Sequence, residues 1–92
     1  MAYYIWDDAK NQKLKAERNV CFEDVVWAID HGYLLGTEDH PHPEKYGGQQ
    51  IMMVALRDYV YMVPFKKSES GEVVLKTIIP SRKATKIYLG KD

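Results

Sequence analysis

Four residues near the carboxyl end form a pattern that suits the binding of an anion. Lys76 lies in the apolar run VVLKTIIP, and Pro80 leads directly into Ser81, Arg82 and Lys83. A buried lysine and cations at a helix N-terminus both cost free energy, so a purely structural role disfavours them. Free backbone N–H groups at the start of a helix, together with Arg and Lys side chains, bind phosphate well. The pattern predicts a site for a negative ligand such as an RNA phosphate.

Two tyrosines could complete this site by stacking on bases. Tyr59 and Tyr61 alternate along the run YVYMVPF, and a hairpin could bring one of them beside Lys76 on an open sheet face. Aromatic rings next to cations are typical of surfaces that bind single-stranded nucleic acid. A register shift of one residue would instead place Met62 opposite Lys76, and the sequence does not fix the turn. Core packing of a tyrosine and a solvated lysine stay open as alternatives.

The charge of the chain is divided unevenly along its length. Residues 76–92 contain five Lys and Arg residues, Lys86 among them, and one Asp, which gives this segment a net charge of +4. The whole chain has 13 Lys and Arg and 13 Asp and Glu, so the remaining residues sum to −4. A nucleic-acid site must therefore be local. The basic segment could equally be a solvated helix face or a surface for an acidic partner protein.

His40 and His42 offer a different chemistry. They lie in the stretch DHPHPEKYGG, where a histidine could act as general base on a ribose 2′-hydroxyl because its pKa lies near neutrality. The same pair could ligate a metal, but Cys21 is the only cysteine and His31 the only other histidine, so we expect no metal site and no cofactor. Two solvated loop histidines are the alternative.

Several protein classes are excluded by composition and motif. The chain has 92 residues and 46% hydrophobic residues, which predicts one globular domain over residues 1–92. The single cysteine suits a reducing compartment, and no apolar run approaches the length of a membrane span, so we expect a cytoplasmic protein without membrane contact. P-loop, dinucleotide, nucleophile-elbow and HExxH patterns are missing, which argues against the hydrolases built on them.

The first half of the chain reads as one strand and two helices. Tyr3 to Trp6 form a short aromatic and β-branched run. The following helix begins at an Asp cap, has only Ala9, Lys13 and Ala16 as a weak stripe, and ends at a left-handed Asn19. The clearest helical period then runs from Phe22 to Ile29 and stops at Gly32.

The second half reads as a long loop, three strands and a helix. We expect a loop at Gly36–Gly48, strands at Gln50–Leu56, Tyr59–Phe65 and Val73–Pro80, and a helix from Ser81 that presents Ala84, Ile87 and Tyr88 on one face. In the last strand Val74, Lys76, Ile78 and Pro80 would share the open face. The order β-α-α-β-β-β-α predicts an α+β fold, with helices on one face of a mostly antiparallel sheet and the other face free.

Three stretches of the chain resemble the BrnT family of bacterial toxins, compact RelE-like ribonucleases that are each encoded with an antitoxin. IWDDAK is similar to the aromatic-Trp-Asp-x-x-Lys start of the family. NVCFEDVVWAI is similar to its Gly-Val-Ser-Phe-Glu-Glu-Ala segment. TIIPSRKAT is similar to its ending Ile-Ile-Ser-Ala-Arg-Lys-Ala-Thr. Departures are Leu14, where the family usually has Asn, residues 17–19, where it has Lys-His-Gly, and Pro80.

The resemblance implies a RelE-like fold and metal-independent cleavage of mRNA. It implies Lys76, Arg82 and Lys83 as phosphate ligands. It points to no particular base, for which His40 and Tyr61 are the candidates, and the residue pattern itself suggests RNA contacts from Tyr59, Ser81 and Lys86. It also implies a cognate antitoxin as partner, with DNA reached only indirectly through that antitoxin. The alternative is a noncatalytic subunit that binds a DNA-binding antitoxin.

Overall fold

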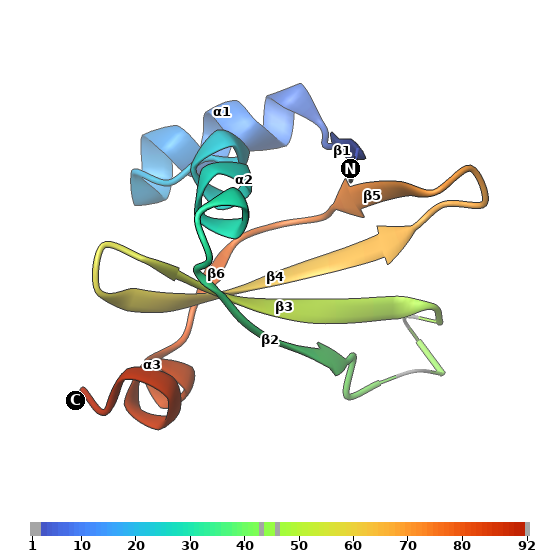
Figure 1. Cartoon of the computed structure of the whole chain (residues 1–92). Coiled ribbons are helices and arrows are strands. Elements are labelled where there is room, and N and C mark those ends of the chain that lie inside the picture. Colours follow the sequence, from blue (N-terminus) through green and yellow to red (C-terminus); the bar gives the residue numbers. More distant parts are fainter. Residues whose placement is uncertain (1–2, 43, 46, 92) are drawn as a thin grey trace.

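The computed structural model describes residues 3–42, 44–45 and 47–91 of the chain (Figure 1). Pro43 and Tyr46 of the predicted loop lie outside these residues. Along the sequence the elements are β1 (Tyr3–Ile5), α1 (Asp8–Arg18), α2 (Phe22–Asp30), β2 (Leu34–Asp39), β3 (Gln49–Leu56), β4 (Tyr59–Lys67), β5 (Glu72–Leu75), β6 (Ile79–Pro80) and α3 (Arg82–Leu89). In this part of the chain no helix is long and apolar enough to cross a membrane.

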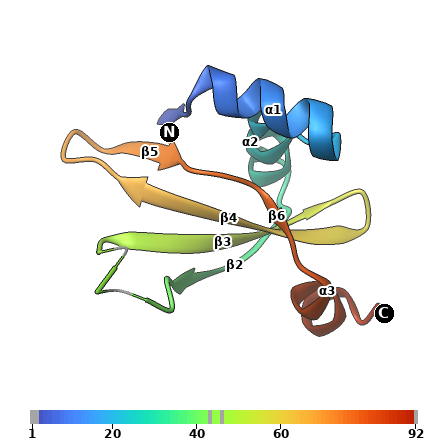
Figure 2. The ribbon, with the colours of Figure 1, turned by 180° about the vertical axis from the view of Figure 1, so that it is seen from behind.

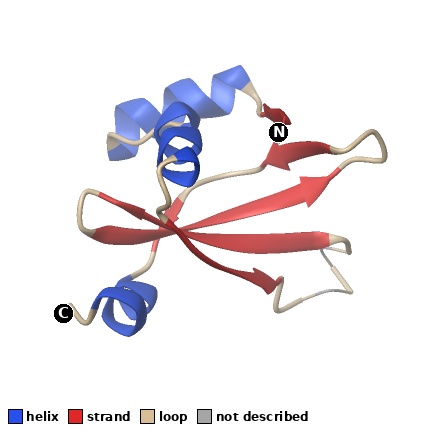
Figure 3. Ribbon diagram, viewed as in Figure 1, coloured by secondary structure: helices blue, strands red, loops and turns tan. Residues whose placement is uncertain are grey.

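The strands form one six-stranded sheet with the order β1-β5-β4-β3-β2, and β6 pairs with β4 beyond the end of β5 (Figure 3). β1 and β5 are parallel, and the other pairs are antiparallel. The predicted α+β class and the mostly antiparallel sheet are therefore confirmed. The β3–β4 hairpin has the expected two-residue turn, with Arg57 and Asp58 both left-handed, but its strands are longer than expected, because β3 begins at Gln49 and β4 continues to Lys67.

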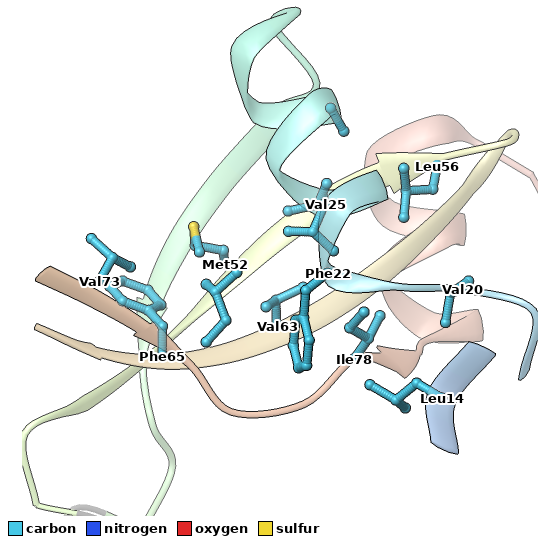
Figure 4. Packing of buried hydrophobic residues seen from close by; sticks show 13 residues of the cluster. Leu14, Val20, Phe22, Val25, Met52, Leu56, Val63, Phe65, Val73 and Ile78 are labelled. Atoms are coloured by element: carbon cyan, nitrogen blue, oxygen red, sulfur yellow. The ribbon is translucent and has the colours of Figure 1, made fainter. Parts of the chain in front are cut away.

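Helices lie on both sides of the sheet, which corrects the expectation of one free face (Figures 1 and 2). The main core forms where α1 and α2 cover one face, around Phe22, Val54 and Val63, all fully buried (Figure 4). Trp6 stacks on Phe22 with ring centroids 5.6 Å apart. On the other face, Ala84 of α3 packs with Val60 in a second, smaller core. Because α3 covers part of that face, less of the sheet is open to a ligand than the sequence predicted.

α1 is fixed to α2 by a buried asparagine rather than by an apolar stripe. Asp7 caps the helix by accepting a hydrogen bond from the Ala9 N–H, and Asn19 ends it in the left-handed region, both as predicted. The expected stripe of Ala9, Lys13 and Ala16 is wrong, because all three are exposed. The inward positions are instead Leu14 and Asn11, which are 3% and 1% exposed. The buried Asn11 side chain therefore needs hydrogen-bond partners within the protein.

Those partners belong to the first turn of α2. The Asn11 Oδ1 accepts a hydrogen bond of 2.7 Å from the Phe22 N–H, and its Nδ2 donates one of 2.7 Å to the Glu23 carboxylate. The bond from Asn11 is the largest cause that lowers the pKa of Glu23 from its ordinary value. The same contact thus links the two helices and favours the charged form of Glu23.

Stability is therefore expected to fall in acid through Glu23. A folded-state pKa below the unfolded value means that the unfolded chain binds more protons, so this contribution is present above the unfolded pKa and lost as pH falls through the folded one. Urea unfolding below neutral pH tests this with the variant Glu23→Gln, whose amide oxygen can still accept the bond. Wild type should lose more stability than Glu23→Gln between about pH 5 and pH 3. Equal losses of stability in both proteins would show that Glu23 does not cause the loss of stability in acid.

The predicted loop at Gly36–Gly48 is wrong at its start, where the chain forms β2. Leu34–Asp39 pairs with β3 from Leu34↔Val54 to Asp39↔Gln50, with a bulge between Leu34 and Gly36. The strand lies at the edge of the sheet and is mostly exposed, so it needs no alternation of apolar residues. Its polar sequence GTED gave no strand signal for that reason.

The predicted last strand, Val73–Pro80, is also corrected, because it breaks into β5 and β6 around residues 76–78. The break shifts the side-chain alternation, and Ile78 is fully buried in the main core instead of sharing an open face with Lys76. In α3 the buried residues are Ala84 and Thr85, whereas Ile87 is 67% exposed. The predicted apolar stripe of Ala84, Ile87 and Tyr88 is therefore wrong at Ile87.

Candidate phosphate-binding site at the start of α3

The N-terminus of α3 is joined to β4 by two hydrogen bonds, and two more lie within its first turn. The Ser81 N–H donates to the Val60 carbonyl at 3.0 Å, and the Thr85 Oγ donates to the Ser81 carbonyl at 2.7 Å. The Val60 N–H donates to the Thr85 Oγ at 2.9 Å. The Ser81 Oγ caps the helix by accepting from the Ala84 N–H at 3.0 Å. These bonds give the residues of the first turn a fixed place on the sheet.

Ser81 is expected to act mainly as a cap, and substitutions can separate this role from anion binding. Ser81→Ala should lower the free energy of unfolding by about 1 kcal/mol, whereas Asn and Asp cap as well as Ser. Ser81→Asn should therefore keep stability and RNA affinity, and Ser81→Asp should keep stability but weaken RNA binding by adding a carboxylate. Urea denaturation and RNA titration of the three variants measure both properties. Undiminished RNA binding by Ser81→Asp would place the phosphate elsewhere.

Three cations form a patch on the exposed side of α3, named here the α3 basic patch: Arg82, Lys83 and Lys86. All three are exposed, and the first turn contains no acidic residue. Lys86 is four positions from Arg82 and three from Lys83, so the three side chains are neighbours on the helix surface. Among the described residues none of the three enters an ion pair. Their charge is therefore available to an external anion.

Tyr61 lies beside the segment that leads into this patch. It pairs with Pro80 in the β4–β6 register, two residues before Arg82. Its ring is partly buried against the main core and meets Tyr59 edge to face, with ring centroids 5.7 Å apart. Both tyrosines are half-buried, so each combines a packing role with an accessible part.

Lys76 is exposed, but its position differs from the predicted one. Its N–H donates to the carbonyl of Pro64 at 2.8 Å, and Pro64 lies three residues from Tyr61 along β4. At the rise of a strand this separates the two positions by about 10 Å. The prediction that Tyr59 or Tyr61 pairs beside Lys76 is wrong, because the chain breaks out of the strand at Lys76. The structure therefore places Lys76 beside Pro64 and not beside the two tyrosines.

Arg18 is a cation that the sequence analysis did not select. From the end of α1, its Nη1 donates a hydrogen bond of 2.7 Å to the carbonyl of Ile78, in the segment between Lys76 and Pro80. The contact spans sixty positions of sequence, so no local pattern could reveal it. The contact fixes the segment that precedes the α3 basic patch. This segment contains Pro80, the residue that pairs with Tyr61.

His40 lies at the opposite end of the strands. Its N–H donates to the Gln49 carbonyl, and Gln49 pairs with Lys66 of β4, five residues from Tyr61. This corresponds to about 17 Å along the strand. The structure therefore does not bring His40 together with Arg82 or Tyr61.

The two loop histidines contact each other and an acidic neighbour. The His42 N–H donates to the His40 Nδ1 at 3.2 Å, so that Nδ1 acts as an acceptor, and the His42 ring lies 3.8 Å from the Glu44 carboxylate. Within the part of the chain that the structure describes, no group of three His, Cys, Asp or Glu residues could hold a metal ion.

Two grooves on the described surface are lined by residues other than Arg82, Lys83 and Lys86. A phosphate on the α3 basic patch would be held by side chains that extend from the helix, together with the free N–H groups of the first turn. Such an arrangement binds the backbone of a strand without enclosing a base.

Comparison with known proteins adds one similarity at the level of structure. Neither family models nor curated protein sequences match this chain. The 1.1 Å crystal structure of the ribonuclease toxin BrnT from Brucella abortus is similar to it, with a TM-score of 0.64 and 17% sequence identity over 88% of this chain and 97% of that chain. The chain therefore has the same fold as that ribonuclease toxin, and the resemblance expected from its sequence is confirmed for the fold.

Proposed function

We propose that the chain is a metal-independent ribonuclease toxin that binds RNA through the α3 basic patch and is neutralised by an antitoxin protein. The observation that carries the proposal is the position of Arg82 and Lys83. They are exposed, without an ion pair among the described residues, on a helix turn fixed to β4 by Ser81 and Thr85. The likeness of the fold to a ribonuclease toxin supports the same assignment.

The proposed chemistry is transfer of the phosphate within the RNA strand. The 2′-hydroxyl loses its proton and its oxygen attacks the phosphorus, the bond to the 5′-oxygen breaks, and that oxygen takes up a proton, which gives a 2′,3′-cyclic phosphate and a 5′-hydroxyl. Arg82 and Lys83 stabilise the two negative charges that the phosphorane develops, a contribution of about 3 to 4 kcal/mol for one well-placed donor. Lys76 and Lys86 bind flanking phosphates, which explains their exposure on either side of the turn.

Tyr61 is the proposed partner of the reacting ribose. Its backbone pairs with Pro80, two residues before Arg82, and its half-buried ring lies against the main core, on the face of the sheet opposite to Ala84 of α3. Its hydroxyl would accept a hydrogen bond from the 2′-hydroxyl, and Tyr59 would support the neighbouring base by stacking. His40 is left out of the catalytic group because of its distance along β4.

The test is cleavage of a purified mRNA by the purified protein in the presence of EDTA. We expect cyclic phosphate ends, a rate that the chelator does not change, and a His40→Ala variant whose rate stays within about twofold of wild type. Chelator-sensitive cleavage would contradict the metal-independent chemistry. A large loss of cleavage rate in His40→Ala would indicate that the general base lies in the histidine loop. No cleavage at any protein concentration would favour a noncatalytic, partner-binding subunit.

A further inference from the structure

A second surface, on the side of the molecule where α2, β2 and the end of α3 meet, forms an apolar groove. The groove has a volume of about 510 Å³, and among its lining residues are Trp27, Tyr33, Leu35, Leu56 and Leu89. Trp27 lies parallel to Tyr33, with ring centroids 6.0 Å apart, and stacks on His31 at 4.0 Å. A groove with an aromatic wall of this kind offers apolar contact area to a ligand.

The elements around the groove also hold most of the exposed apolar side chains. Of six large hydrophobic residues that are exposed in the described chain, Trp27 and Tyr33 line the groove, and three more belong to β2 or α3: Leu34, Ile87 and Tyr88. Trp27 is 55% exposed. A monomer seldom leaves apolar side chains gathered in this way, and such gathering marks interaction surfaces.

The open edge of the sheet lies next to this groove. β2 is the last strand in the sheet order, so among the described strands nothing pairs with its outer side. The His40 N–H bonds to Gln49, and hydrogen bonds in an antiparallel pair alternate along the strand. Thr37 and Asp39 consequently direct their backbone N–H and C=O groups outward. An incoming extended chain could pair with these groups.

The charges around the groove select the kind of ligand. α2 and β2 together carry Glu23, Asp24, Asp30, Glu38 and Asp39, and neither contains Lys or Arg. The two acids that line the groove are each offset by a cation, Asp24 by Arg57 at 3.2 Å and Asp58 by Lys91 at 3.3 Å. The negative charge that no ion pair among the described residues offsets therefore lies beside the groove, on Asp30 at the end of α2 and on Glu38 and Asp39 of β2. We call these acidic residues of α2 and β2 the acidic rim, and their negative charge repels RNA. A second copy of the chain would bring two acidic rims together, so self-pairing is disfavoured as well.

We propose that the groove and the β2 edge bind an extended segment of the antitoxin polypeptide, with apolar side chains in the groove and flanking Lys or Arg residues on the acidic rim. The naming of the partner as the antitoxin rests on the proposed function, whereas the chemistry of the segment follows from this surface alone. α3 joins the two sites, because Leu89 lines the groove and Arg82 begins the same helix. Eight helical residues span about 12 Å, so a partner seated here reaches the α3 basic patch.

The probe is a short synthetic peptide of alternating valine and leucine between terminal lysines, with a matched peptide that ends in glutamates. Backbone amide resonances of the full chain are followed during titration. We expect the lysine peptide to bind about tenfold more tightly than the glutamate peptide, with the largest shifts at Trp27, Thr37 and Asp39. Trp27→Ala should weaken binding about tenfold, as expected for an aromatic anchor.

Several results would overturn the proposal. These are equal binding of the two peptides, shifts elsewhere on the chain, no binding, an RNA oligonucleotide that shifts the same amides, or dimerisation of the free chain through β2. RNA cleavage is measured separately from peptide binding. Trp27→Ala should cleave RNA at a rate within about twofold of wild type, so a failure of the ribonuclease proposal can be distinguished from a failure of the groove proposal. A chain that binds the lysine peptide but cleaves no RNA keeps the groove assignment and loses the nuclease.

Discussion

Replacing Arg82 by alanine is expected to slow RNA cleavage by about 10²- to 10³-fold, as the loss of one charged donor at a developing oxyanion does in other enzymes. Arg82 is exposed on the first turn of α3, and no hydrogen bond or ion pair of the described protein depends on its side chain. The free energy of unfolding should therefore change by less than about 0.5 kcal/mol. Growth arrest on induced expression should be lost together with the cleavage.

The control for this change is Lys13→Ala, which removes an exposed cation from α1. It should leave the cleavage rate within about twofold of wild type, so a general loss of positive charge is not the cause. Arg82→Lys keeps the charge but loses the planar pair of donors, and an intermediate rate is expected. If a correctly folded Arg82→Ala protein cleaves RNA at the wild-type rate, Arg82 has no place in the site.

Replacing Asn11 by leucine is expected to destabilise the whole fold by about 2 to 4 kcal/mol. The change leaves the Phe22 N–H buried without a partner and removes the bond to the charged Glu23, and each loss has its own cost. Leucine has the same branched skeleton as asparagine and a larger volume, so no cavity forms. In a domain of this length the melting temperature should fall by roughly 10 to 25 °C.

Thermal unfolding followed by circular dichroism measures this effect. The matched control is Gln12→Leu, which introduces the same side chain at the next, exposed position of α1 and should alter stability by less than about 0.5 kcal/mol. A melting temperature of Asn11→Leu equal to that of Gln12→Leu would show that the contact between α1 and α2 does not hold the helices together.

Elements with a local signal were predictable from sequence. The 3.6-residue period from Phe22 to Ile29, the Asp7 cap, the left-handed Asn19 and the β3–β4 hairpin all follow from neighbouring residues. β2 was missed because an edge strand with an exposed polar half is held by its ladder to the next strand, β3, and has no apolar alternation of its own. The break at residues 76–78 was missed because an apolar run reads as a continuous strand.

The same distinction applies to the candidate site. Ser81, Arg82 and Lys83 are adjacent in sequence, so their grouping at the start of α3 required only the recognition of a helix N-terminus. The relation of Lys76 to the tyrosines depended on register, and the strand break changed it. Asn11 and Arg18 act through contacts with α2 and with Ile78, and no spacing in the sequence signals either contact.

The two charged surfaces divide the molecule between its proposed ligands. The α3 basic patch suits a polyanion, whereas the groove lies between acidic elements whose nearby cations are already paired. The proposed antitoxin segment would be held in the groove and, by extending along α3, would also block RNA at the patch. This arrangement differs from the simplest expectation, in which an acidic partner covers the basic segment directly.

The placement of RNA on α3 is tested most directly by titrating the isotope-labelled chain with a 2′-O-methyl oligonucleotide, which binds but cannot be cleaved, and mapping the shifted backbone amides. The largest shifts are predicted at Ser81, Arg82, Lys83 and Tyr61, with the amides of Trp27 and Thr37 unchanged. Shifts centred on the groove or on the loop around His40, with none at the start of α3, would contradict this placement.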